Sequence, residues 1–197
     1  MSDEETAEEV AGEPVISFAT AADCEVWFDE HQADRRGFWL KIGKAGAAET
    51  VTYVEALDVA LCHGWIDGQK RGYDETYWLQ RFTPRGPRSV WSQINRDKAE
   101  ALITAGRMRP AGQAKVDAAK ADGRWAAAYA GQKSATVPDD LAAALAADPD
   151  AHAFFETLTR ANRFAILYRV GEAKKPETRA ARIAKFVEMC HRHETLH

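Results

Sequence analysis

A run of β-branched and aromatic residues, Thr76–Phe82 (TYWLQRF), constrains the fold more than any other segment of the chain. Residues of these types favour the pleated, half-buried surface of a β-strand. Phe38–Ile42 alternates in the same way, Val15–Phe18 has strand character, and Trp65–Gly68 runs from bulky residues into a turn. Together these segments predict a small antiparallel sheet.

Helix caps and helical spacing mark most of the remaining chain. Thr20 can cap one helix, and Thr52 with Glu55 has the form of a capping box at the start of another. Beyond Pro84 and Pro87 the apolar residues recur at helical spacing. Helices are expected over about 21–31, 52–62, 89–105, 111–122, 136–148, 151–158, 164–171 and 176–190, with a further helical turn over about 124–129.

The fold class predicted by these patterns is α+β, a small antiparallel sheet with helices followed by an all-helical C-terminal region. Residues 1–14 are acidic and have few large apolar groups, so they are expected to be a disordered arm. A Gly-, Ser- and Thr-rich linker over 130–137 separates an α+β domain, 15–130, from a helical domain, 136–193.

Composition places the 197-residue chain among soluble globular proteins. No apolar run is long enough to span a bilayer, and the N-terminal segment lacks the features of a signal peptide, so a cytoplasmic location is expected. The three cysteines, Cys24, Cys62 and Cys190, are odd in number and far apart, which favours reduced thiols over a disulfide framework.

Charge is distributed unevenly behind the net charge of -4. Residues 1–34 carry eleven acids and no Lys or Arg, whereas 81–115 and 160–193 are strongly basic. Such asymmetry can mark contact with an anion, an acidic protein or nucleic acid, or it can be a solvated surface lying near the acidic arm. The sequence pI of about 5.9 and the lack of a standard nucleic-acid-binding module argue against nucleic acid.

The stretch from Cys62 to Arg96 combines large rings, arginines and turn residues, and it carries the main hypothesis about a ligand. Arg85 and Arg88 precede a helix start, where free amides and the helix dipole favour an anion, and Trp91 offers a stacking face. The predicted ligand-binding residues are Trp65, Asp67, Arg85, Arg88, Ser89, Trp91 and Asn95, with Lys174 and Arg179 closing the site from the C-terminal part. In the structural alternative, Arg88 stacks on Trp91, the serines only cap the helix, and Arg179 pairs with Glu177 or Glu55.

Asp67 lies in a segment expected to be partly buried, where a carboxylate needs a partner. It is either a general base, or a group that orients an arginine, or half of an internal ion pair. The ion pair is the favoured interpretation, because structural networks also place acids beside bases without catalysis.

Two Cys-His pairs are candidates for a chemical site. Cys62 and His63 are adjacent on a helix and therefore point in different directions, so Cys62 is expected to pack as a small hydrophobe and His63 to lie at the helix end. Cys190, with the histidines that follow it, fits no zinc pattern. No metal, no cofactor and no complete catalytic set is predicted, and the balance is against an enzyme.

Four blocks of sequence carry a resemblance to a known family: ALCHGWIDGQ (60–69), RFTPRGPRSVWSQINR (81–96), GRMRPAGQAKVDAAKADGRW (106–125) and AKKPETRAARIAKFVEM (173–189). In this order they resemble the YdeI/OmpD-associated, or bacteriocin-protection, proteins. The resemblance implies an α/β N-terminal part, a helical C-terminal part and a role in bacteriocin protection and the envelope-stress response. The function expected is the binding of a small anionic ligand at a basic-aromatic cleft. The alternatives are a protein-interaction module that uses its basic surface, and nucleic-acid binding.

Overall fold

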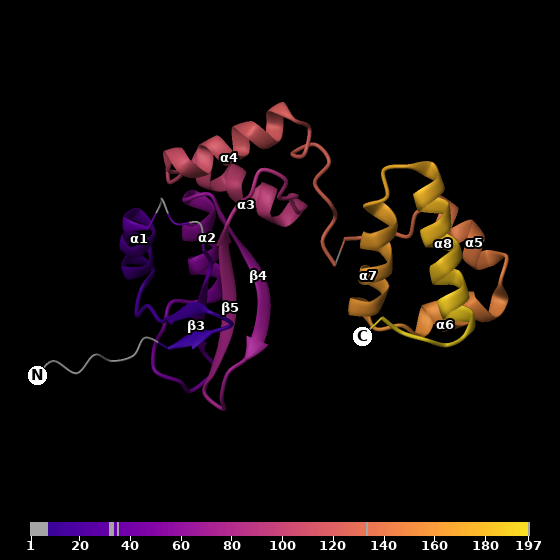
Figure 1. The fold of residues 1–197 in the computed structure, drawn as a ribbon, viewed down its shortest axis with the longest axis horizontal. Helices are drawn as coiled ribbons and strands as arrows, with labels where there is room; N and C mark the ends of the chain where they lie inside the picture. The colour runs from indigo at the N-terminus through magenta and orange to yellow at the C-terminus, as the bar shows by residue number, and fades with distance from the viewer. Residues whose placement is uncertain (1–7, 32–33, 35, 133, 197) are drawn as a thin grey trace, which may run out of the picture. The chain divides into compact units, whose positions relative to one another are not determined.

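The computed structural model describes residues 8–31, 34, 36–132 and 134–196. The chain divides into two compact units (Figure 1). Unit 1 comprises Met1–Trp91 and Asn95–Ala128, and unit 2 comprises Ser92–Ile94 and Tyr129–His197. No helix in the described part of the chain is both long and apolar enough to cross a membrane.

Unit 1 is built on a five-stranded sheet in the order β1-β2-β3-β5-β4. The strands are β1 (Glu9–Val10), β2 (Glu13–Ile16), β3 (Phe38–Gly43), β4 (Trp65–Gly72) and β5 (Tyr77–Pro84). The α+β fold class is confirmed, but the sheet is mixed rather than antiparallel throughout, because β2 pairs with β3 in parallel. Helix α1 (Ala21–Glu30) forms the crossover that a parallel pair requires.

The acidic segment that was expected to be disordered contributes to this sheet. Residues 1–7 of that segment lie outside the described residues, but β1 and the start of β2 fall within 8–14. The two strands form an antiparallel hairpin in which Val10 pairs with Glu13. Pairing of β2 with β3 and an ion pair made by Glu13 offset the ordering entropy, and neither interaction is visible in local composition.

The inner face of the sheet packs on α1 and α2 (Tyr53–Cys62), which lie together on one side of it in Figure 1. Both helices begin at the predicted threonine caps, Thr20 and Thr52, each in a complete capping box. The alternation of β3 and β5 explains the burial of this face, since every second side chain points toward the helices. Its large members are Phe38, Leu40, Ile42, Trp65 and Phe82.

A close helix-helix approach joins α2 to α4 (Pro110–Ala121), which follows α3 (Gln93–Thr104). A Cβ atom added at Gly112 would lie 2.2 Å from the carbonyl oxygen of Cys62, so the end of α2 occupies the space of a side chain. The same carbonyl accepts a hydrogen bond from the backbone N–H of Arg109, at 3.2 Å. In place of the expected helical turn over 124–129, residues 124–127 form turns and Tyr129 forms an isolated bridge with Ser92.

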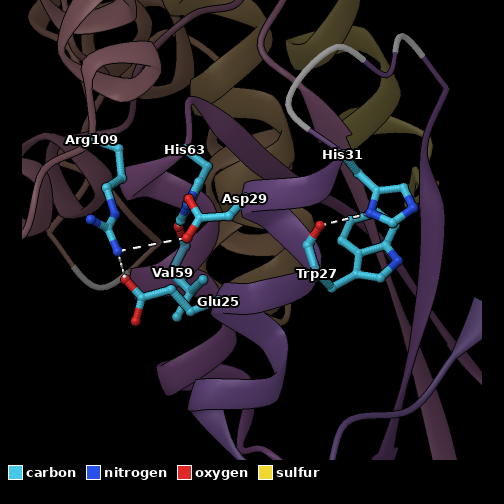
Figure 2. A network of polar contacts seen from close by, with 7 residues as sticks. All are labelled: Glu25, Trp27, Asp29, His31, Val59, His63 and Arg109. Atoms are coloured by element: carbon cyan, nitrogen blue, oxygen red, sulfur yellow. Dashed lines mark hydrogen bonds and ion pairs between the residues drawn. The ribbon is translucent and has the colours of Figure 1, made fainter.

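Polar side chains link α1 to the ends of α2 and α4 (Figure 2). The buried His63 ring contacts the Val59 carbonyl through Nδ1, at 2.9 Å, and Asp29 Oδ1 through Nε2, at 3.0 Å. Arg109 Nη2 donates to Glu25 Oε1 at 2.8 Å and lies 3.8 Å from Asp29 Oδ2. The network holds three helices of unit 1 together.

Unit 2 contains α5 (Asp139–Ala146), α6 (Pro149–Thr157), α7 (Arg160–Gly171) and α8 (Pro176–His191). Their core includes Leu141, Phe155, Ile166 and Phe186, with Cys190 buried beside them. Pro138 is the N-cap of α5, so this helix begins at Asp139 and not at the expected position 136. Pro149 begins α6 instead of ending α5, because the Asp148 side chain caps the new helix.

We predict that Gly112→Ala destabilises unit 1 by about 1–3 kcal/mol, because the added methyl group overpacks the contact with Cys62. Gly171→Ala is the matched helical control, since a Cβ at Gly171 would meet nothing within 4 Å. The control should be neutral or slightly stabilising. Urea denaturation monitored by circular dichroism measures both, and equal stability of the two variants would contradict the packing described.

Candidate anion-binding site

Three of the predicted ligand-binding residues are part of the core of unit 1. Trp65 packs against Phe28, with ring centroids 5.3 Å apart, and Trp91 packs against Trp125 at 4.7 Å. The buried guanidinium of Arg85 lies 3.6 Å from the centre of the Trp91 ring, and its Nη1 donates to the Val90 carbonyl at 3.2 Å. The stacking expected of Arg88 is therefore made by Arg85, and it fixes the loop before α3.

Asp67 is held by neutral donors. Tyr53 Oη–H donates to Asp67 Oδ2 at 2.8 Å, and Asn95 Nδ2 donates to Oδ1 at 3.4 Å. Burial, and then the negative charge of Asp67, raise the pKa of the Tyr53 hydroxyl. Hydrogen bonds that join β4 to α2 and α3 thus take the place of the expected ion pair.

The other predicted residues lie apart from these clusters. Arg88 is exposed, and the Ser89 carbonyl accepts a hydrogen bond from Arg124 at 2.8 Å, while α3 begins only at Gln93. Lys174 and Arg179 belong to unit 2, where Lys174 is exposed. Arg179 binds Asp140 through two hydrogen bonds, at 2.6 and 2.8 Å, instead of Glu177 or Glu55, because α8 packs beside α5.

The cysteines and His63 behave as packed residues. All three cysteines are buried free thiols, and burial raises the pKa of Cys24 to about 12 and that of Cys62 to about 11. Both ring nitrogens of His63 are engaged, so the ring is not placed to activate Cys62. Within the described residues, no group of three or more His, Cys, Asp or Glu side chains could hold a metal ion.

The face of the sheet opposite α1 and α2, here called the outer face, gathers cations and aromatic rings. Its members are Trp39 and Lys41 on β3, Tyr77, Leu79 and Arg81 on β5, and Arg71 on β4. Trp39 is directly opposite Arg81, and Leu79 lies between Lys41 and Arg71 in one row across three strands. The register therefore places three positive charges on one surface of the sheet.

These cations lie over the rings of the same face. Lys41 Nζ is 5.0 Å from the centre of the Tyr73 ring and 4.9 Å from that of Tyr77. The Arg71 guanidinium is 5.9 Å from the centre of the Trp39 ring. Leu79 is fully buried between the long side chains, so the outer face is packed rather than loosely solvated.

A carboxylate site lies where the outer face meets β2, and it consists of the Arg81 side chain and the backbone N–H of Gly37. Glu13 occupies it. Arg81 Nε donates to Glu13 Oε2 at 2.6 Å, and Nη2 donates to Oε1 at 2.5 Å. The hydrogen bonds from Arg81, followed by the Arg81 charge and the Gly37 amide, lower the pKa of Glu13. A Cβ at Gly37 would lie 3.0 Å from Glu13 Oε1, so glycine permits this close approach.

Arg81 is not among the ligand-binding residues predicted from the sequence. Its partner is Glu13, which is 68 residues away in the sequence and joined to Arg81 only by the pairing of β2, β3 and β5. The alternation of Tyr77, Leu79 and Arg81 was a usable signal, because it places Arg81 and the inward Phe82 on opposite faces.

Two family models match the chain. Residues 16–115, slightly more than half of the sequence, match a family described as a domain of unknown function (DUF8412). The chain belongs to this family. Residues 134–193 match the family described as bacteriocin-protection, YdeI or OmpD-associated. Searches of curated proteins and of solved structures found no match.

The second match confirms the family resemblance, and it falls on unit 2. The fourth sequence block, 173–189, lies inside the matched residues 134–193. The first two blocks, 60–69 and 81–96, lie instead within the match to the domain of unknown function, together with the carboxylate site. The two units of the chain thus match two different families.

We predict that the Glu13 carboxyl titrates below its ordinary pKa of 4.5 and that Arg81→Ala raises its pKa toward that value. Because the folded-state pKa is the lower one, the ion pair contributes stability above pH 4.5, and this contribution is lost as the pH falls through the folded-state pKa. NMR titration of the glutamate side chains measures the shift. Lys98→Ala, which breaks a separate ion pair with Asp58, should leave Glu13 unchanged.

Proposed function

We propose that unit 1 binds an anionic ligand through the carboxylate site and the outer face of its sheet. The observation that supports this is the grip on Glu13, in which one guanidinium donates two hydrogen bonds to one carboxylate. This fork geometry matches a planar carboxylate and combines orientation with charge. The Glu13 carboxylate thereby shows how the carboxylate of a ligand would be held by Arg81.

The surroundings of the carboxylate site favour anions beyond a single contact. Lys41 and Arg71 add two positive charges to the outer face, and Arg71 is exposed to solvent. Arg36 adds positive charge next to Glu13 and contributes to its lowered pKa. A ligand with one carboxylate on Arg81 and further negative charge over β3 and β4 meets complementary charge.

The ligand class remains the one expected from the sequence, but the proposed place is different. The loop before α3 contains a buried Arg85 that stacks on Trp91, so these two residues maintain the fold. Arg81, which lies at the start of the same basic region, takes the role that was expected of Arg85 and Arg88. Small carboxylates and acidic segments of proteins share the chemistry that this site recognises.

The binding test uses Glu13→Gln, because this substitution removes the internal carboxylate and keeps the size of the side chain. Citrate should raise the melting temperature of this variant, and at about a hundred times the dissociation constant the stabilisation is about 2.7 kcal/mol. The double variant Glu13→Gln, Arg81→Ala should lose the citrate-dependent shift. Differential scanning fluorimetry at constant ionic strength measures it.

Glu13→Gln, Lys98→Ala is the matched control. Lys98 forms a 2.6 Å ion pair with Asp58, and its side chain is 29% exposed, close to the 34% of Arg81. This control should keep the citrate-dependent shift. The proposed site would be refuted if the Arg81→Ala double variant kept the citrate-dependent shift in melting temperature, or if the Lys98→Ala double variant lost it to the same extent. Either result would show that citrate acts through the overall charge of the protein and not through Arg81.

A further inference from the structure

We infer that the β1-β2 hairpin is an exchangeable occupant of the carboxylate site, and that an extended acidic peptide from another protein takes the place of β2 along β3. This inference rests on the proposed function and adds to it the kind of partner and the regulation of the site. It follows from how the hairpin is attached, from its turn and from the register of β2.

The attachment of the hairpin to the sheet is short. β2 pairs with β3 at Val15 and Ile16, whereas β3 pairs with β5 along its whole length. Beyond this pairing, Glu13 binds Arg81, Arg36 Nη2 donates to the Gly12 carbonyl at 2.8 Å, and Tyr73 donates to Glu8. Two of these side-chain contacts are made by the carboxylates of Glu13 and Glu8. A carboxylate of an incoming peptide can therefore make the same hydrogen bonds in their place.

The turn of the hairpin contains a residue that is unfavourable for its backbone conformation. Ala11 has φ = 55° and Gly12 has φ = 75°, and together they join Val10 to Glu13 as a two-residue connection. Such a turn, with positive φ at both central residues, favours Asn-Gly. Alanine is disfavoured at the first position because its Cβ crowds the backbone in this region. The closed hairpin therefore carries local strain that opening relieves.

The register of β2 specifies the chemistry of the replacing peptide. Glu13 and Val15 point to the outer face, where Arg81 binds the carboxylate, and Ile16 points to the inner face and packs on the core of unit 1. The peptide should therefore carry an acid, followed two and three residues later by branched apolar side chains. Its main chain would pair with the edge of β3 that β2 leaves when the hairpin opens, which is strand addition.

A peptide fits this place better than a nucleic acid, although both are anionic. The site of Ile16 is apolar and the edge of β3 offers backbone donors and acceptors in strand spacing. A polynucleotide supplies neither a strand edge nor a branched apolar group at that position. The nucleic-acid alternative is therefore included as an arm of the test.

The test uses a probe taken from the chain itself, a fluorescently labelled peptide of residues 12–18, Gly-Glu-Pro-Val-Ile-Ser-Phe. Fluorescence anisotropy measures its binding to the full chain and to two variants that shift the hairpin in opposite directions. Glu13→Gln weakens the closed state and should bind the peptide on the order of tenfold more tightly. Ala11→Asn creates the favoured Asn-Gly turn and should bind it roughly threefold more weakly.

A second peptide, with Gln in place of its Glu, tests Arg81 without altering the protein. It should bind Glu13→Gln roughly tenfold more weakly than the parent peptide does, since it lacks the carboxylate that Arg81 recognises. Equal binding of the two peptides would refute both the inference and the assignment of the site. Citrate binding that depends on Arg81, with equal peptide affinity in all three proteins, would leave the proposed function intact and refute the exchange.

Two further outcomes would overturn the choice of partner. Tighter binding of a hexauridylate probe than of the peptide, lost in Arg81→Ala, would assign the surface to nucleic acid. Dimerisation of Glu13→Gln in size-exclusion chromatography, with no uptake of the peptide, would show that a second copy of the chain supplies the strand.

Discussion

The packing of the inner face of the sheet on α1 and α2 is the constraint on which the rest of unit 1 depends. Phe38, Leu40 and Phe82 must point toward the helices. A shift of the strand register by one residue would place these side chains on the opposite face, away from the helices. The same pleat then obliges Trp39 and Arg81 to lie opposite one another on the outer face. The cationic surface is thus a geometric consequence of the apolar core.

The Glu13–Arg81 pair has the properties of a contact that can be exchanged. Exposed ion pairs generally contribute little to stability, whereas a buried pair is costly to break. This pair lies between the two limits, with Glu13 14% and Arg81 34% exposed at the side chain. Its two short hydrogen bonds give it direction, and in the proposed exchange the partly exposed arginine would let a competing carboxylate begin to bind before Glu13 leaves.

Local signals predicted much of the fold, and long-range contacts account for most of the differences. The caps at Thr20 and Thr52 and the strand at Tyr77 depend on neighbours in the sequence, and they formed as expected. The parallel pairing of β2 and the contact of Glu13 with Arg81 depend on segments far apart, which no window of sequence contains. Arg85 and Arg88 show the same limit, because composition identified a stacked arginine but the turn geometry decided which of the two it was.

The uneven charge of the sequence becomes complementary charge in the fold. Glu13 binds Arg81 and Glu25 binds Arg109, so ion pairs join the acidic beginning of the chain to its basic middle. The contact between Glu25 and Arg109 fastens helices to one another (Figure 2), and the contact between Glu13 and Arg81 holds a short hairpin at the edge of a cationic surface. Because the neutralising group at the carboxylate site is tethered, it acts at a high effective concentration. An external anion that displaces it would therefore have to match more of the surface than a single carboxylate does, and the peptide that we propose would do so through its apolar side chains and its backbone.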